Sequence, residues 1–279
     1  HLKSVKNGLY RALLTRMNER GLRWSELTPE PGIVDALQYA GDRAEVKKKR
    51  QDDKRHWSER FADGCALAIA RQLRDSKELK GKEISPYALG IGTERLVPLG
   101  SGDAKRIDVT VTDAVLGLEI GVSLKGLNFR DKRSNNFDKN LTGRLYELAD
   151  EVRFVHERLP HAFMAGVFFL PLNSVDDKKI GESSFARAVL KLRERTGRLD
   201  PTLPAQAARC DCGFVALYTT GSEGFPAGLT RFMNVLSDPP RRGRPRISDT
   251  LSLKEAVEVI VSTATHSADR HWGDPDQPT

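Results

Sequence analysis

Residues 105–125, KRIDVTVTDAVLGLEIGVSLK, alternate apolar and polar side chains along most of their length. Successive side chains of a strand point to opposite faces of a sheet, so a period of two is typical of half-buried strands. The alternation is interrupted once and then resumes. We therefore predict a β-hairpin that carries Asp108, Glu119, Ser123 and Lys125 on one polar face.

The register of this hairpin decides which polar side chains meet. A two-residue turn at 113–114 would place Asp108 opposite Glu119 and leave Lys125 roughly 20 Å away, at the usual rise of a strand. A bend nearer 116–117 would bring Asp108 beside Lys125. We favour the second register because it assembles one site, which is a functional reason and not one of turn propensity.

The patterns on either side of the hairpin alternate between helix and strand, which is typical of an α/β fold. A serine at 252 with a glutamate three residues later predicts the start of the last helix by a capping box. The predicted elements are helices over 3–21, 33–40, 44–75, 138–158, 182–195 and 252–265, and strands near 96–97, at 161–172 and at 213–219. The predicted division is a helical N-terminal extension (1–54), a core domain (55–236), a basic linker (237–250) and a C-terminal helix and tail (251–279).

The composition favours a polyanionic partner. Of 279 residues 30% are charged, the formal net charge is +7 and the pI is about 9.3. A basic balance of this size is usual in proteins that bind nucleic acid. The three cysteines, Cys65, Cys210 and Cys212, are too few for a disulfide framework, and we expect the last two to pack at the start of a strand. With no run of eighteen apolar residues, we expect a cytoplasmic protein without a membrane partner.

The order of these elements resembles the PD-(D/E)xK, or restriction-endonuclease-like, nuclease superfamily. The matching residues are Asp108 on the first strand of the hairpin and Ser123-Leu124-Lys125 on the second. The resemblance covers roughly residues 55–175. It implies an αβββαβ core, in which a mixed central sheet is flanked by helices, here with a helical N-terminal extension and a C-terminal helix.

The resemblance also implies Mg²⁺ as the cofactor for phosphodiester hydrolysis. Carboxylates and water bind this ion, which neutralises charge on phosphoryl oxygens and activates an attacking water. Asp108 would be the principal ligand. Lys125 would orient or help to deprotonate the water, or stabilise charge in the transition state.

Position 123 departs from the family pattern, because Ser123 stands where an acid is usual. Another carboxylate must then complete the metal site. Glu119 on the same strand and Glu59 on the preceding helix are equally good candidates. Glu94, near the preceding strand, ranks below them.

Two basic segments are candidates for contacts with DNA. The loop after the hairpin could touch phosphates beside the scissile bond, or could simply be solvated. The segment Pro240–Arg246 resembles an AT-hook, whose thin Arg-Gly-Arg-Pro core enters a narrow minor groove, although a basic linker would look the same. The candidate DNA-binding residues are Arg130, Lys132, Arg133, Arg241, Arg242, Arg244 and Arg246.

These features predict a Mg²⁺-dependent endonuclease of a restriction or defence system that acts on double-stranded DNA. A homodimer is left open. The alternative is a non-catalytic DNA-binding module that retains a nuclease-like core, and Ser123 keeps this alternative open. A third interpretation is an interaction subunit whose basic surface serves a partner protein. Without any such role, Asp108 and Lys125 would form a surface ion pair on an exposed sheet face.

Overall fold

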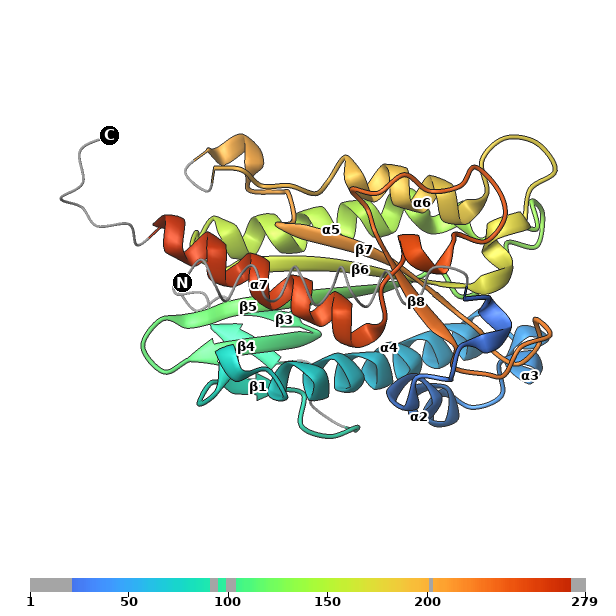
Figure 1. Cartoon of the computed structure of the whole chain (residues 1–279), viewed down its shortest axis with the longest axis horizontal. Coiled ribbons are helices and arrows are strands. Elements are labelled where there is room, and N and C mark those ends of the chain that lie inside the picture. Colours follow the sequence, from blue (N-terminus) through green and yellow to red (C-terminus); the bar gives the residue numbers. More distant parts are fainter. Residues whose placement is uncertain (1–21, 91–94, 99–103, 201–202, 272–279) are drawn as a thin grey trace.

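The computed structural model describes residues 22–90, 95–98, 104–200 and 203–271. Its centre is a six-stranded mixed sheet in the order β1-β4-β5-β6-β7-β8 (Figure 1). Strands β5, β6 and β7 are parallel, and the other neighbours are antiparallel. The strands are β1 (Glu83–Ser85), β4 (Val109–Asp113), β5 (Gly117–Gly126), β6 (Phe163–Pro171), β7 (Cys212–Tyr218) and β8 (Thr230–Asn234). A separate antiparallel pair joins β2 (Arg95–Pro98) to β3 (Ala104–Ile107).

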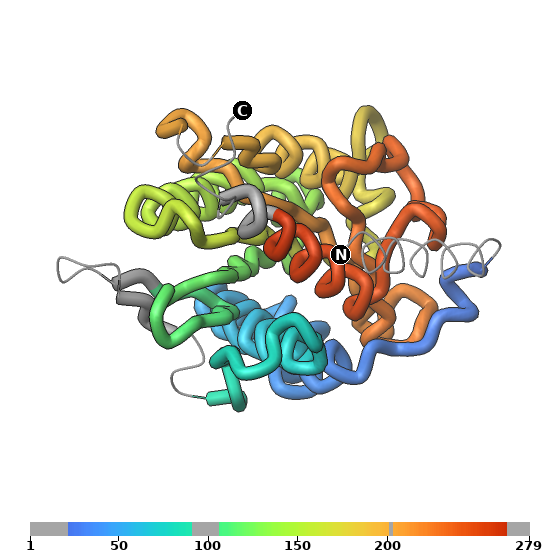
Figure 2. Tube along the Cα trace, turned by 60° about the vertical axis from the view of Figure 1, so that its left-hand side comes forward, coloured from blue at the N-terminus to red at the C-terminus, as the bar shows by residue number. Residues whose placement is uncertain are grey.

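Helices cover both faces of the six-stranded sheet (Figure 1, Figure 2). On one side, here called the α4 face, α2 (Pro31–Ala40), α4 (Gln51–Arg74) and α7 (Leu253–His271) share one apolar core with the strands. On the other side, the α5 face, α5 (Leu141–His156) and α6 (Ser184–Arg193) share a second core. The short helices are α3 (Arg43–Lys47), η1 (Trp24–Glu26), η2 (Lys77–Leu79), η3 (Asp138–Asn140), η4 (Leu172–Asp176), η5 (Pro204–Gln206) and η6 (Ile247–Asp249).

Most of the predicted elements are confirmed, because periodicity is a local property that packing preserved here. The predicted helices at 33–40, 138–158, 182–195 and 252–265 correspond to α2, α5, α6 and α7, and the predicted strands near 96–97, at 161–172 and at 213–219 to β2, β6 and β7. The capping box is present, since Ser252 N donates to Glu255 Oε2 at 2.8 Å and Glu255 N donates to Ser252 Oγ at 3.2 Å. The helix predicted over 3–21 lies outside the described residues.

Strands β1 and β8 were not predicted from the sequence. β1 is only three residues long, too short for a period to show. β8 contains Arg231, and a charged residue in the sequence usually indicates an exposed position, but Arg231 is buried. Its guanidinium donates to Thr250 Oγ1 and Thr250 O, both at 3.0 Å, so the hydrogen bonds offset the cost of burial.

The first strand of the predicted hairpin is not continuous. It divides at Asp108 into β3, which pairs with β2, and β4, which pairs with β1 and β5. Ile107 packs on the α5 face, whereas Val109 packs on the α4 face. In a regular strand, residues two positions apart point to the same face. Ile107 and Val109 do not, so the strand is interrupted at Asp108.

A β-bulge interrupts the second strand. Val111 pairs with Ile120, but the next residue, Thr112, pairs with Leu118, which leaves Glu119 as the extra residue. A bulge shifts every side chain beyond it to the other face. Leu118 therefore packs on the α5 face while Ile120 packs on the α4 face. The prediction of one uninterrupted polar face from Glu119 onward was wrong for this reason.

The described parts of the predicted N-terminal extension and C-terminal segment are not separate from the core. Ile33 and Ala36 of α2 and Val257 and Ile260 of α7 lie in the same apolar core as α4. In the part of the chain that the structure describes, no helix combines the length and the apolar character needed to span a membrane.

Candidate functional site

The hairpin brings Asp108 beside Ser123 and Lys125. Val109 pairs with Val122, so Asp108 reaches the next part of β5, where Leu124 N donates to Asp108 Oδ2 at 2.6 Å. The bend occupies residues 114–116, between the two positions that the sequence left open, and the bulge at Glu119 adds the residue that brings Asp108 to this part of β5. The predicted proximity of Asp108 to Ser123 and Lys125 is therefore confirmed, whereas the bend nearer 116–117 that was expected to produce it is not observed.

A fourth residue, Glu151 of α5, completes the cluster. Glu151 Oε2 accepts hydrogen bonds from Ser123 Oγ and from Lys125 Nζ, both at 2.8 Å. Glu151 is 6% exposed and Ser123 is fully buried. The sequence reasoning missed Glu151, although it placed the helix correctly. A carboxylate thus lies directly beside the serine that replaces the family's usual acid.

The apolar stripe of α5 aims Glu151 at the sheet. Glu151 lies three residues after Leu148 and four before Val155, both fully buried on the inward side of the helix. Residues at these spacings share one helix face. A glutamate within the inward stripe was the signal that could have identified it from the sequence.

Small residues in the sheet let α5 approach closely enough for this contact. Gly166 of β6 pairs with Ser123 of β5 in the parallel register. A Cβ at Gly166 would lie 2.9 Å from Leu148 Cδ2 and 3.2 Å from Cys210 Sγ, closer than carbon contacts allow. The absence of a side chain at this position therefore sets the distance between helix and sheet.

Electrostatics keep Lys125 protonated. Burial alone would lower the pKa of Lys125, but the carboxylates of Glu151, Asp108 and Glu147 favour the ammonium, and the pKa is raised. Its side chain is 14% exposed. An ammonium at this place can donate hydrogen bonds and stabilise negative charge, but it has no free lone pair with which to act as a base.

A pocket of about 520 Å³ opens onto the cluster and gives solvent and small groups access to it. Its lining includes Lys125 of β5, Glu151 of α5 and Arg106 of β3. The acids Glu147 and Asp150 form the remaining lining. The pocket therefore combines cations with carboxylates, as a site for a metal and a phosphate requires.

The donor set suits Mg²⁺. This ion is usually held by one or two carboxylates, with waters and substrate oxygens in the remaining positions. Asp108 and Glu151 both favour the charged form of Lys125. Within the described ranges no three His, Cys, Asp or Glu side chains are grouped closely enough to hold a metal by themselves. The fit is therefore to an ion shared with substrate and water.

Glu59 and Glu119 do not join this cluster. Glu59 is exposed on α4, on the opposite face of the sheet, where its carboxylate lies 3.4 Å from Arg55 Nε and 3.3 Å from His56 Nδ1. The helix predicted over 44–75 is divided at 48–50 into α3 and α4, and the phase of α4 points the Glu59 side chain to solvent. Glu94 lies outside the described residues.

Glu119 belongs to a separate ionic cluster near the hairpin bend. Lys82 Nζ lies 2.7 Å from both Glu119 Oε1 and Asp113 Oδ2. The hydrogen bonds that Lys82 donates to Asp113 and Glu119 raise the pKa of Lys82, and the one to Asp113 lowers the pKa of Asp113. The bulge turned Glu119 toward this lysine, so its expected place at the metal was wrong.

In the loop after β5, the side chain of Arg130 has a structural role. The guanidinium of Arg130 donates to Asn135 O at 3.0 Å and Asn173 O at 3.3 Å, and it lies 4.9 Å from the ring centroid of Phe137. Lys132 and Arg133 are exposed at the tip of the loop. Of the three predicted side chains, these two are the exposed ones.

The segment around Gly243, predicted as a linker that resembles an AT-hook, is hydrogen-bonded to the rest of the fold. Gly243 N donates to Val175 O and to Asp176 Oδ1, both at 3.0 Å. Pro245 is buried and its carbonyl accepts from Trp24 Nε1 at 3.2 Å. A backbone held in this way is not available for insertion into a minor groove, which contradicts the AT-hook interpretation.

The arginines of this segment have different surroundings. Arg244 lies over the ring of Phe225, with 5.1 Å between guanidinium and centroid. Arg241, Arg242, Arg244 and Arg246 are all exposed. All four therefore stay candidates for phosphate contacts made from the surface.

Cys210 and Cys212 are both buried at the start of β7. Cys210 packs on the α5 face and Cys212 on the α4 face. Burial raises the pKa of both thiols, so they stay protonated. The predicted packing role is confirmed.

Comparisons of the chain with protein-family models, curated proteins and solved structures found no match.

Proposed function

We propose that this protein is a Mg²⁺-dependent endonuclease, restriction-endonuclease-like in its core, that hydrolyses phosphodiester bonds of DNA in a restriction or defence system. The observation that supports this most strongly is the hydrogen bond between Glu151 and Ser123. It supplies a carboxylate at the one position where the sequence departs from the family pattern. Together with Asp108 and Lys125, Glu151 provides the two carboxylates and the one cation that the proposed reaction requires.

Each side chain would have a distinct part in the reaction. Mg²⁺ bound here would supply a Lewis acid and lower the pKa of a water. Asp108 and Glu151 would hold the ion and so set where the scissile phosphate lies. Ser123 would keep the Glu151 carboxylate oriented through its hydrogen bond. Lys125, held as an ammonium, would stabilise the negative charge that develops on the phosphoryl oxygens.

The alternative function is a DNA-binding module without catalytic activity. One observation favours it, namely that Glu151 Oε2 already has Ser123 and Lys125 as partners. A carboxylate satisfied in this way could be a structural ion pair and nothing more.

Cleavage of supercoiled plasmid DNA, with Mg²⁺ and with EDTA, separates the two functions. We expect nicked and linear products only with Mg²⁺, and their loss in Asp108→Asn, Lys125→Met and Glu151→Gln. Glu59→Gln is the matched control, because this exposed glutamate on α4 was an equal candidate from the sequence and should keep full activity. Full cleavage by Glu151→Gln would disprove the assigned site, and DNA binding by the wild type without cleavage would select the alternative.

A further inference from the structure

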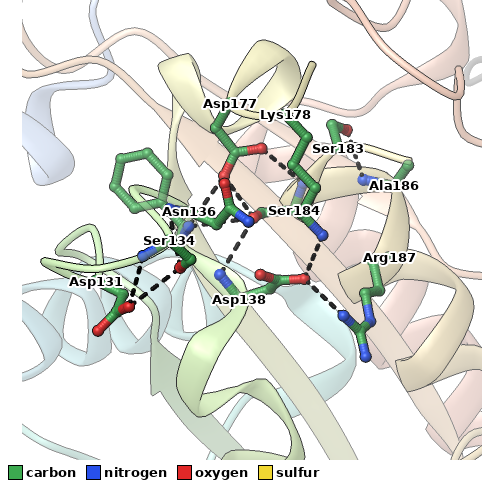
Figure 3. A network of polar contacts seen from close by, with 11 residues as sticks. Asp131, Ser134, Asn136, Asp138, Asp177, Lys178, Ser183, Ser184, Ala186 and Arg187 are labelled. Atoms are coloured by element: carbon green, nitrogen blue, oxygen red, sulfur yellow. Dashed lines mark hydrogen bonds and ion pairs between the residues drawn. The ribbon is translucent and has the colours of Figure 1, made fainter. Parts of the chain in front are cut away.

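Two basic segments that lie far apart in the sequence are tied to the same short region before α6. The loop after β5 is the first, and Asp177 anchors it by accepting from Phe137 N at 2.9 Å. The other oxygen of Asp177 accepts from Ser184 N at 2.9 Å (Figure 3). The loop and the start of α6 are thus held together by one carboxylate.

The second segment, around Arg241, is bound to the same region. Ser183 N donates to Arg241 O at 2.9 Å, and Arg242 Nη1 donates to Lys179 O at 2.6 Å. Gly243 N reaches the carbonyl of Val175 in η4 at 3.0 Å. Residues 175–184 therefore connect the two basic segments.

The acids of this region are committed to internal contacts. The side chain of Asp131 is 8% exposed and accepts from Ser134 N at 2.9 Å while it pairs with Lys139. Asp138 is 6% exposed and pairs with Lys178 at 2.6 Å and Arg187 at 3.1 Å (Figure 3). Their negative charge organises the loop and the helix instead of facing a partner.

The cations, in contrast, project outward. Lys132, Arg133, Lys179, Arg241 and Arg242 are all exposed, and we call these five residues the basic surface. The exposed acids of the connecting region are Asp176, whose carboxylate accepts from Gly243 N, and Glu182. Positive charge therefore predominates where the three segments meet.

We propose that the basic surface is a single binding site for the phosphate backbone of double-stranded DNA, separate from the pocket at Lys125. This inference rests on the proposed function, since DNA would be the substrate. Strand β5 ends at Gly126, one residue after Lys125, and leads directly into the loop that presents Lys132 and Arg133. A duplex at the pocket can extend along this loop, and contacts to phosphates fix its position without reading its sequence.

The test is equilibrium binding of a duplex of about 20 base pairs in EDTA over a range of salt concentrations. Each phosphate contact adds roughly 0.9 to the slope of log K against log salt. We expect the slope to fall by about two in Lys132→Ser/Arg133→Ser, by about two in Lys179→Ser/Arg241→Ser, and by about four in the combined variant. Within the described residues, Arg133 and Arg241 form hydrogen bonds through their backbones and Lys179 through its carbonyl, so these substitutions leave those bonds in place.

The matched control is Lys77→Ser/Lys80→Ser, which removes two exposed lysines beyond the end of α4. Its slope should equal that of the wild type, and thermal unfolding should show that every variant is folded. Unchanged slopes in both surface variants, a change in only one of them, or an equal change in the control would each overturn the single basic surface.

Failure of this inference can be told from failure of the proposed function. If the wild type cleaves DNA but the slopes do not change, the basic surface is wrong and the nuclease stands. If the slopes change as expected but no variant or wild type cleaves DNA with Mg²⁺, the basic surface stands and the nuclease is wrong.

Discussion

Glu151 Oε2 lies 2.8 Å from Lys125 Nζ, and both side chains are largely buried between β5 and α5. The pair joins the α5 layer to the sheet at the candidate site. Removing two charges from water costs free energy, and the attraction between them offsets this cost only when the geometry is good. A buried pair of this kind therefore points either to good geometry or to a role beyond stability. This relationship leads to predictions about stability as well as activity.

Removal of one partner should cost more stability than removal of both. Glu151→Leu leaves the Lys125 ammonium buried, and we expect the free energy of unfolding to fall by about 3–5 kcal/mol. Lys125→Met/Glu151→Leu removes both charges of the pair and should be more stable than Glu151→Leu alone. Urea unfolding of the two single variants and the double variant measures the coupling. Strictly additive changes would mean that the two side chains do not interact in solution.

The stability contributed by Lys125 should depend on pH at the alkaline end. Because its pKa in the folded protein is raised above 10.5, the contribution is complete below pH 10.5 and is lost as the pH rises through the folded pKa. The difference in unfolding free energy between wild type and Lys125→Met should therefore shrink only above about pH 10.5. Urea midpoints of both proteins from pH 8 upward test this, and a difference that shrinks already near pH 8 would show a lowered pKa.

Gly166 should be intolerant of any side chain, because it sets the approach of α5. In Gly166→Ala the new methyl would meet Leu148, and we expect a loss of about 1–3 kcal/mol from overpacking. Displacement of α5 would also move Glu151 and reduce Mg²⁺-dependent cleavage. Gly143→Ala is the matched control, since a methyl there meets nothing within 4 Å and should stabilise α5 by roughly 0.5–1 kcal/mol. Equal behaviour of the two variants would refute this role of Gly166.

The missing acid should be movable from helix to strand. Glu151→Ala removes the carboxylate and should abolish cleavage. Ser123→Asp/Glu151→Ala returns a carboxylate to the neighbouring position on β5, into the space left by Glu151, and should restore part of the activity. Initial rates of plasmid nicking compare the variants, with Ser123→Asp alone as the reference. A folded double variant that binds DNA but never cleaves it would argue that Glu151 acts other than as a metal ligand.

The sequence by itself determined the local elements of this protein. Apolar residues at helical spacing predicted α5, and an unbroken apolar run predicted β6, because both signals depend only on neighbouring residues. The alternation around Asp108 and Lys125 likewise marked the hairpin that carries the candidate site. Site residues whose position follows from a local periodicity, such as Asp108 and Lys125, could therefore be identified from the sequence.

Only the tertiary structure decided which charged groups meet. The bulge at Glu119 depends on pairing with β4, and one extra residue in the register sends that carboxylate to Lys82 instead of the site. Glu151 reaches Ser123 because Gly166 lets a helix pack closely against a strand distant in sequence. Contacts of this kind arise from the packing of separate elements, which no local period encodes.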